Sequence, residues 1–324
     1  MMQRRHFLRL TANAVTLSML GRAAQADTYP ARPVHIIVGF PPGAASDINA
    51  RLIGDWLSQR LGEQFVIDNR PGAGSNIGAE IAAHSPPDGY TLFAVSPVNA
   101  INASLYPDLS FKFLQDFAPV AGIIRTPLIM EVDPSLPVKS VAEFIAYAKA
   151  NPGKVNFASS GNGTGSHVAA ELFKIMTGIE MTHVPYHGPA QALTDLISGR
   201  VQVMFDVLTS SMAHVRSGEV RGIAVTTATR SPALPDLPTV GDTVPGYEAS
   251  GWAALIAPKG TPAGSIGILN AAVNAGLADP TIISRLAALG GQPLVMTPAE
   301  LGKFMTDETA KWAKVVQFAN IKVE

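Results

Sequence analysis

Short runs rich in valine, isoleucine and phenylalanine alternate with helical patterns along most of this 324-residue chain. Such alternation is typical of βαβ units and of a mostly parallel sheet. The first unit has a strand at 35–40, a turn at 41–47 and a helix at 48–61, which Gly62 ends as a C′ glycine. A strand at 64–68, a loop at 70–76 and a helix at 77–84 follow, and a strand at 91–96 opens into a polar loop through Asn99 and Asn102. The alternation predicts an α/β fold.

The same design of strand, glycine-rich loop and helix is repeated after Pro127. A strand at 128–132 precedes a helix at 140–150, whose N-cap Ser140 and N3 residue Glu143 form a capping box. A strand at 154–159 then leads through a glycine-rich loop at 160–166 into a helix at 167–177. Further strands are expected at 181–186, 201–207 and 220–227, with a helix at 189–198, before a proline-rich stretch at 231–238 breaks the pattern.

The rest of the chain holds one strand at 252–257 and three helices near 265–277, 281–289 and 298–318. One strand with terminal helices is too little for a third domain, so this segment is expected to return to the first lobe. We predict two lobes, 27–127 with 247–324 and 128–246, whose mostly parallel sheets are joined by a hinge of two crossings. Because ligands bind off the carboxyl ends of strands in open α/β sheets, the cleft between the lobes is the expected binding site.

The amino terminus has the three parts of an export signal. Basic residues at 4–9 precede an apolar run at 11–20 and the small-residue cleavage site Ala24-Gln25-Ala26. The apolar run is shorter than the roughly twenty residues that span a bilayer, so residues 1–26 are predicted to be removed and the mature protein to enter the periplasm. Arg4 and Arg5 resemble a twin-arginine signal, but Gln3 departs from that pattern, which leaves both the Sec and the twin-arginine routes open.

Composition excludes several classes of function. The signal contains four of the 24 Lys and Arg residues and none of the 25 Asp and Glu, so the mature chain carries a formal charge of −5, which argues against a nucleic acid partner. The absence of cysteine rules out disulfides, thiolate metal sites and a cysteine nucleophile. His183 and His187 have the spacing of helical metal ligands, but Pro185 lies between them, so neither a metal nor a cofactor is predicted. A monomer is expected.

Three glycine-rich loops carry the chemistry that this sequence offers. The loops at 40–47, 71–76 and 159–166 contain no Lys or Arg, and they lead into predicted helix N-termini, whose free N–H groups attract anions. Such loops can hold a carboxylate through main-chain N–H groups, the hydroxyls of Ser159 or Thr164, and water. The alternative is that the glycines only permit tight turns between strand and helix.

A series of short motifs, in a fixed order along the chain, carries a family resemblance. They stand at 29–33, 40–47, 66–74, 87–92, 166–167, 183–186, 192–196 and 230–236, and they include Phe40-Pro41-Pro42-Gly43 and Pro87-Asp88-Gly89-Tyr90. In these segments the sequence resembles the Bug family of periplasmic binding proteins, which is related to the substrate-binding component of tripartite tricarboxylate transporters. The resemblance implies a type II periplasmic-binding-protein fold that captures small carboxylates, amino acids or aromatic acids for membrane permease subunits.

The resemblance also implies a set of ligand-binding residues. They are Phe40, Gly43, Asp47, Gly72, Gly74 and Asn76 from the first lobe, and Ser159, Gly163, Thr164, His167 and Asp206 from the second. Ala44 and Ser75 stand where the family commonly has glycine, and each adds a side chain beside the expected ligand.

Three alternatives stay open from the sequence alone. Asp47 either caps a helix or points into the cleft, where it favours an amino acid with an ammonium group. Trp252 lies either in the core or in the wall of the cleft. Ser166 and His167 allow a hydrolase to be considered, although neighbouring residues at a helix start point in different directions. We therefore predict a binding protein without catalytic residues, with a periplasmic hydrolase as the alternative.

Overall fold

The computed structural model describes residues 29–322, so the predicted export signal lies outside the described residues. The chain begins with β1 (Val34–Val38), α2 (Ala45–Leu61), β2 (Phe65–Asn69), the 3-10 turn η1 (Ala73–Ser75), α3 (Asn76–Ala83), β3 (Thr91–Val95) and α4 (Pro97–Leu105). It continues with β4 (Phe117–Val132), α5 (Val141–Ala150), β5 (Asn156–Ser159), α6 (Gly165–Thr177), β6 (Thr182–Pro185), α7 (Pro189–Ile197), β7 (Val203–Val207), α8 (Leu208–Ser217) and β8 (Arg221–Val225). It ends with η2 (Val240–Asp242), β9 (Ser250–Pro258), α9 (Ala263–Leu277), α10 (Pro280–Ala288), β10 (Gln292–Pro293) and α11 (Pro298–Phe318).

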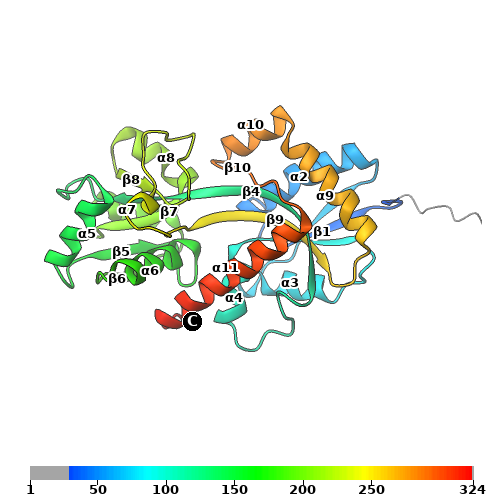
Figure 1. The fold of residues 1–324 in the computed structure, drawn as a ribbon, viewed down its shortest axis with the longest axis horizontal. Helices are drawn as coiled ribbons and strands as arrows, with labels where there is room; N and C mark the ends of the chain where they lie inside the picture. Colours follow the sequence, from blue (N-terminus) through cyan, green and yellow to red (C-terminus); the bar gives the residue numbers. More distant parts are fainter. Residues whose placement is uncertain (1–28, 323–324) are drawn as a thin grey trace, which may run out of the picture.

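The molecule consists of two α/β halves joined by β4 and β9 (Figure 1). In the first half β1 pairs in parallel with β2 and β3, and in the second half β5 pairs in parallel with β6 and β7. Each antiparallel pair among the described strands includes β4 or β9. The predicted α/β fold is therefore confirmed, but the sheet is mixed: among the described strands four pairs are parallel and five are antiparallel, because the crossing strands β4 and β9 run antiparallel to their neighbours.

A strand was predicted to begin after Pro127, at 128–132, and this start was wrong for β4. This strand is continuous from Phe117 to Val132. Pro127 lies opposite Ser250 at the end of the pairing with β9, and Leu128 begins the pairing with β7. Proline cannot donate a ladder hydrogen bond, and it is tolerated here because the partner strand changes at this point. The lobe boundaries at 127/128 and 246/247 remain predictions, the first of them inside this strand.

The polar loop expected through Asn99 and Asn102 was also wrong, because the chain forms helix α4 there. Pro97 occupies the first helical turn, where its missing N–H costs little, and the Ser96 N–H donates to Asn99 Oδ1 at 3.1 Å. Both asparagines are buried. Two predicted helix caps are confirmed. Gly62 ends α2 in the left-handed conformation at φ 81°, and Ser140 accepts from the Glu143 N–H at the start of α5.

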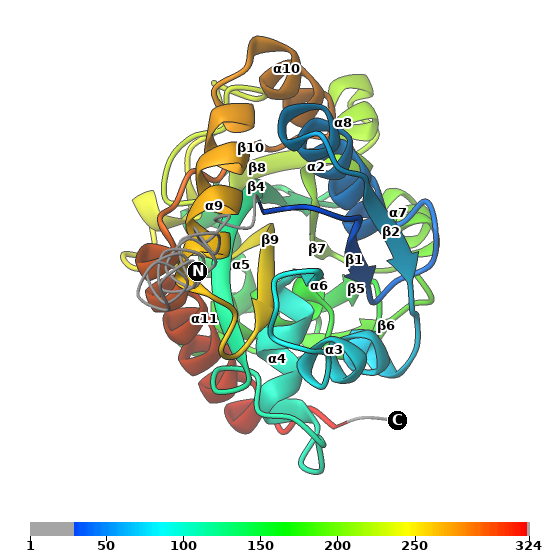
Figure 2. The same ribbon diagram turned by 90° about the vertical axis from the view of Figure 1, so that its right-hand side faces the viewer.

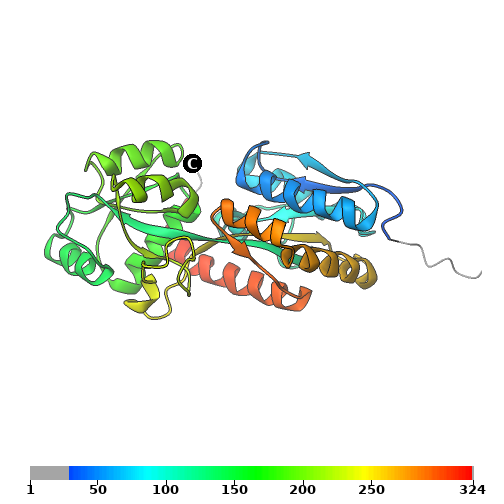
Figure 3. The same cartoon turned by 90° about the horizontal axis from the view of Figure 1, so that it is seen from above.

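One hydrophobic cluster runs through both halves. It includes Phe93 and Phe117 in the first half, Phe157 and Phe173 in the second, and Trp312 on α11. Helix α11 packs against α4 and β4 and also against α6, so it extends along the junction of the halves (Figure 3). Viewed along the long axis, α2, α9 and α10 lie on one face of the first sheet, and α3 and α4 on the other (Figure 2).

Within residues 29–322, no single helix is both long and apolar enough to cross a membrane, and α9 and α10 reach that length and hydropathy only together, with a 75° bend between them.

Candidate ligand-binding cavity

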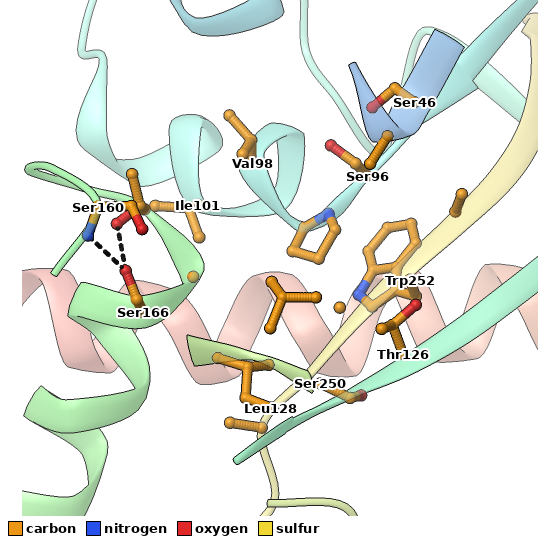
Figure 4. A pocket seen from close by; sticks show the side chains of 18 of the residues that line it. Ser46, Ser96, Val98, Ile101, Thr126, Leu128, Ser160, Ser166, Ser250 and Trp252 are labelled. Atoms are coloured by element: carbon orange, nitrogen blue, oxygen red, sulfur yellow. Dashed lines mark hydrogen bonds between the residues drawn. The ribbon is translucent and has the colours of Figure 1, made fainter. Parts of the chain in front are cut away.

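A cavity of about 330 Å³ lies at the junction of the two halves. Its lining comes from the carboxyl ends of strands and the helix starts that follow them, together with β4, β9 and Trp312 of α11. Figure 4 shows Ser46 and Ser96 on one side, the hydrogen-bonded Ser160 and Ser166 on another, and Trp252 across from them. The site is therefore built by both halves, as the cleft prediction requires.

Four helix N-termini reach this cavity. The lining includes first-turn residues of α2, α4 and α6 and the N-cap residue of α8: Ala45, Ser46, Pro97, Val98, Gly165, Ser166 and Val207. In the described part of the chain, α2, α6 and α8 have no N-cap side chain that accepts from their own first-turn N–H groups. The free N–H groups and the positive end of each helix dipole therefore act on the cavity.

Missing caps are not confined to the cavity, because α3, α7 and α9 also lack them within residues 29–322. Helices α5, α10 and α11 show the contrast, since Ser140, Asp279 and Thr297 cap them by accepting N–H hydrogen bonds. What distinguishes the cavity is the convergence of several uncapped helix starts on one enclosed space. Such a space favours an anion without a basic side chain.

Apart from the amide of Asn49 and the carboxyl of Asp206, the side chains around the cavity are apolar or carry hydroxyl groups. Within the described residues, no Lys, Arg or His lines it, and Asp206 is its one titratable group. Hydroxyls come from Ser46, Ser96, Thr126, Ser160, Thr164, Ser166 and Ser250, and the apolar walls include Phe40, Ile101, Ile124, Leu128, Trp252 and Trp312. This arrangement suits a ligand with a carboxylate head and a hydrocarbon or aromatic body.

The structure brings together some of the residues predicted from the sequence. Phe40, Ala44, Thr164 and Asp206 line the cavity. The lining does not include Gly43, Asp47, Gly72, Gly74, Ser75, Asn76, Ser159, Gly163 or His167. Their contacts show what most of these residues do instead.

Asp47 anchors the loop that precedes α2. Ala44 is the N-cap, so the interpretation of Asp47 as the cap was wrong. The Asp47 carboxylate accepts from the Gly43 N–H at 2.9 Å, from Arg51 Nε at 3.0 Å and from Asn69 Nδ2 at 2.9 Å. The hydrogen bond from Arg51 is the main reason why the pKa of Asp47 falls to about 2. This carboxylate ties the loop to β2 and is not directed at an ammonium group of a ligand.

The second glycine-rich loop packs against α4. Asn102 Nδ2 donates to the Gly74 carbonyl at 2.7 Å and to Asn76 Oδ1 at 3.0 Å, and Asn99 Nδ2 donates to Ser75 Oγ at 3.3 Å. Gly74 has φ 60°, a conformation that favours glycine. The structure therefore gives this loop a supporting role, in which it fixes the helix whose N-terminus faces the cavity.

The third loop is shaped by two stacked imidazoles. The Gly163 N–H donates to His167 Nδ1 at 3.1 Å, and the His167 ring stacks on His183 with 3.7 Å between centroids. Burial, with a further contribution from His183, lowers the pKa of His167 to about 3, so the ring is neutral. Two hydrogen bonds complete the loop: the Ser160 N–H donates to Ser166 Oγ at 2.9 Å, and Thr164 Oγ1 donates to the Gly161 carbonyl at 2.7 Å.

Sequence reasoning missed the side of the cavity that α4 provides. Ser96 is 9% exposed and lines the cavity, and its hydroxyl has no hydrogen-bond partner among the described residues. The sequence Ser96-Pro97 with Asn99 at N3 is typical of a helix N-terminus, but this segment was predicted to be a loop. Trp252 proves to be both core and cavity wall, because it is 3% exposed and lines the cavity.

Two α/β halves joined by crossing strands, with an anion-attracting cavity between them, have the architecture of a periplasmic solute-binding protein. The model of the tripartite tricarboxylate transporter family receptors matches residues 49–321, and the chain therefore belongs to this family. Protein BugT of Bordetella pertussis is 37% identical over 320 residues, which cover 97% of this chain and 98% of BugT.

Two solved structures show the same relationship. The R. palustris protein Rpa4515 with adipate is 40% identical, with a TM-score of 0.76, and the match covers 91% of this chain and 99% of that one. The periplasmic binding protein BugD is 31% identical, with a TM-score of 0.72 and coverage of 91% and 100%. The Bug-family resemblance and the periplasmic-binding-protein fold predicted from the sequence are confirmed. No cluster of three or more potential metal ligands occurs within residues 29–322.

Proposed function

We propose that this protein is a periplasmic receptor that captures a small organic acid between its two halves and hands it to membrane permease subunits. The convergence of four helix N-termini on a cavity without lysine or arginine carries this proposal. The adipate bound to Rpa4515 supports a carboxylate as the ligand class. The export signal at the amino terminus supports a periplasmic location, and we propose that the receptor acts as a monomer.

The walls of the cavity indicate what kind of acid fits. A carboxylate near Ser46, Ser160 and Thr164 would receive main-chain and hydroxyl hydrogen bonds. The body of the ligand would then contact Trp252 and the neighbouring aliphatic side chains. A tricarboxylate would place further charges against these apolar walls, where they lose water without gaining partners. We therefore propose a mono- or dicarboxylate with a hydrocarbon or aromatic body.

The hydrolase alternative finds less support in the geometry. Ser166 Oγ accepts from the Ser160 N–H, and His167 Nδ1 accepts from the Gly163 N–H, so each is committed to the loop. Ser159 Oγ lies 2.6 Å from His183 Nε2, but Ser159 is fully buried and does not line the cavity. A nucleophile needs access to its substrate, so binding without chemistry is the function that we propose.

A ligand screen tests the proposal. We expect adipate or benzoate to raise the melting temperature of the mature protein, with smaller shifts from citrate and glutamate. At one hundred times the dissociation constant, binding adds about 2.7 kcal/mol to the free energy of unfolding. Recovery of the unaltered acid after incubation would separate a receptor from an enzyme. If none of the four acids stabilises the protein, the proposal fails.

The unpartnered hydroxyl of Ser96 gives a second prediction. We expect Ser96→Ala to weaken binding of the best acid from the screen by about threefold to tenfold, because one hydrogen bond contributes about 0.5–1.5 kcal/mol. The melting temperature of the unliganded protein should stay unchanged or rise, since the hydroxyl has no partner within residues 29–322. Calorimetry checks the affinity. Equal affinities of parent and variant would show that Ser96 does not contact the ligand.

A further inference from the structure

Two buried carboxyl groups share one hydroxyl directly behind the cavity. Asp206 at the end of β7 lines the cavity and is 2% exposed, and Glu131 on β4 is fully buried. Ser211 on α8 connects them, because its Oγ lies 2.8 Å from Glu131 Oε1 and 3.3 Å from Asp206 Oδ2. A contact path therefore runs from the cavity through Asp206 and Ser211 to Glu131.

No basic side chain neutralises this pair among the described residues. The basic groups on β4, β8 and α8 have other partners or are exposed: Arg125 pairs with Glu248, His214 with Glu219, Arg221 donates to the carbonyls of Pro134, Leu136 and Val138, and Arg216 is exposed. On the helices that pack against β7 and β4, Lys174 pairs with Glu171, Lys311 pairs with Glu308, and His167 accepts from the Gly163 N–H. Asp133, beside the end of β4, accepts from Ser135. The charge that acts on Glu131 is the negative charge of Asp206, which disfavours ionisation of the Glu131 carboxyl group.

Asp206 also accepts hydrogen bonds from the Val207 N–H and from the Ser210 side chain, whereas Glu131 depends on Ser211. A hydroxyl has one hydrogen, so Ser211 can donate to only one of the two carboxyl groups at a time. Glu131 Oε2 has no hydrogen-bond partner in the described part of the chain. Burial raises the pKa of Glu131 well above its usual range, and burial also raises the pKa of Asp206 to about 6. At neutral pH Glu131 therefore keeps its proton, while Asp206 is near its titration range.

Asp206 stands beside the helix start that would receive the ligand's carboxylate. Strands β5 and β7 are parallel neighbours with Ala158 opposite Met204, and each chain reaches the cavity two residues later, at Ser160 and Asp206. An ionised Asp206 would repel an anion in this space, and the low local dielectric would strengthen the repulsion. A protonated Asp206 would instead donate a hydrogen bond to the carboxylate.

We propose that Asp206 takes up one proton from solvent when an acid binds, so that the receptor captures a carboxylate together with a proton. This proposal rests on the proposed function and specifies the charge state in which the site accepts its ligand. The bound carboxylate and Asp206 then share the proton, and the site gains no net charge from a monoanion. Glu131 stays protonated throughout and keeps a second negative charge away from the pair.

Calorimetry with adipate between pH 6.5 and 8 tests the proposal, because free carboxylic acids are already ionised in this range. Binding is expected to take up close to one proton per site at pH 7.5, measured as the dependence of the heat on the ionisation enthalpy of the buffer. The affinity is expected to fall by up to tenfold per pH unit above about 6, because proton uptake is required only where free Asp206 is ionised. If adipate binds without proton uptake, the proposal is overturned.

Three variants assign the proton. Asp206→Asn is expected to bind adipate with no proton uptake and no pH dependence, and at pH 8 at least as tightly as the parent. Glu131→Gln is expected to keep the uptake, as is the control Asp55→Asn at an exposed position of α2. Uptake that persists in Asp206→Asn or is lost in Glu131→Gln would overturn the assignment. If Asp206→Asn does not fold, the pH profiles of the parent and of Glu131→Gln still decide. A protein that binds none of the four acids at any pH would overturn the proposed function itself.

Discussion

Gly165→Asp is expected to weaken acid binding by at least about a hundredfold without destabilising the protein. Gly165 is the first residue of α6 and lines the cavity, and a Cβ added there meets no atom within 4 Å. The new carboxylate would occupy the space proposed for that of the ligand, where like charges at close range cost several kcal/mol. At the same time, an acidic side chain in the first helical turn stabilises a helix by about 0.3–1 kcal/mol.

The two effects of Gly165→Asp therefore have opposite signs, which separates them from a general folding defect. Gly264→Asp is the matched control, because Gly264 lies in the first turn of α9, outside the cavity lining, and its added Cβ also meets no atom. Gly165→Ala tests the effect of bulk alone. Calorimetry and thermal unfolding measure both properties. If Gly165→Asp binds the best acid within threefold of the parent, the carboxylate does not sit at the start of α6.

Gly163 would be a poorer position for this experiment. It has φ 70°, and an added Cβ would lie 2.8 Å from Leu105 Cδ2. Its N–H also donates to His167 Nδ1, so a side chain there would disturb the loop whether or not a ligand is bound.

Glu308→Ala is expected to lower the free energy of unfolding by about 3–5 kcal/mol, because it breaks a buried network of charged hydrogen bonds. Glu308 is 4% exposed, and its Oε2 accepts from the indole N–H groups of both Trp252 and Trp312 at 3.0 Å. Its other oxygen pairs with Lys311. Truncation leaves two buried indole donors and an ammonium without their acceptor.

Thermal and denaturant unfolding measure this loss, which should lower the melting temperature by on the order of 10 °C. Glu308→Gln keeps an acceptor for the indoles and should cost less. Asp307→Ala is a control on the same helix, since the Lys303–Asp307 pair is exposed and should contribute no more than about 1 kcal/mol. Because Trp252 and Trp312 line the cavity, Glu308→Ala should also weaken acid binding. A free energy of unfolding within 1 kcal/mol of the parent would contradict the proposed role of Glu308.

The sequence by itself determined the elements that depend on near neighbours. The helical spacing of apolar residues and the residues that flank each helix were enough to place the terminal helices, with α11 at Pro298–Phe318 as predicted. Gly62 and Ser140 act as local caps, which explains why both were predicted correctly. The absence of Lys and Arg from the three loops was equally visible, and it holds for the whole cavity lining within residues 29–322.

Only the tertiary structure decided which of these loops faces the ligand space. The loop at 71–76 looked equivalent to the loop at 40–47, but α4 covers it through Asn99 and Asn102. The Glu131–Asp206 pair and the Glu308–Trp252 hydrogen bond join residues that are far apart in the sequence. Periodicity and capping report on a few neighbouring residues, whereas strand order and the packing of α4, α8 and α11 decide which distant side chains meet.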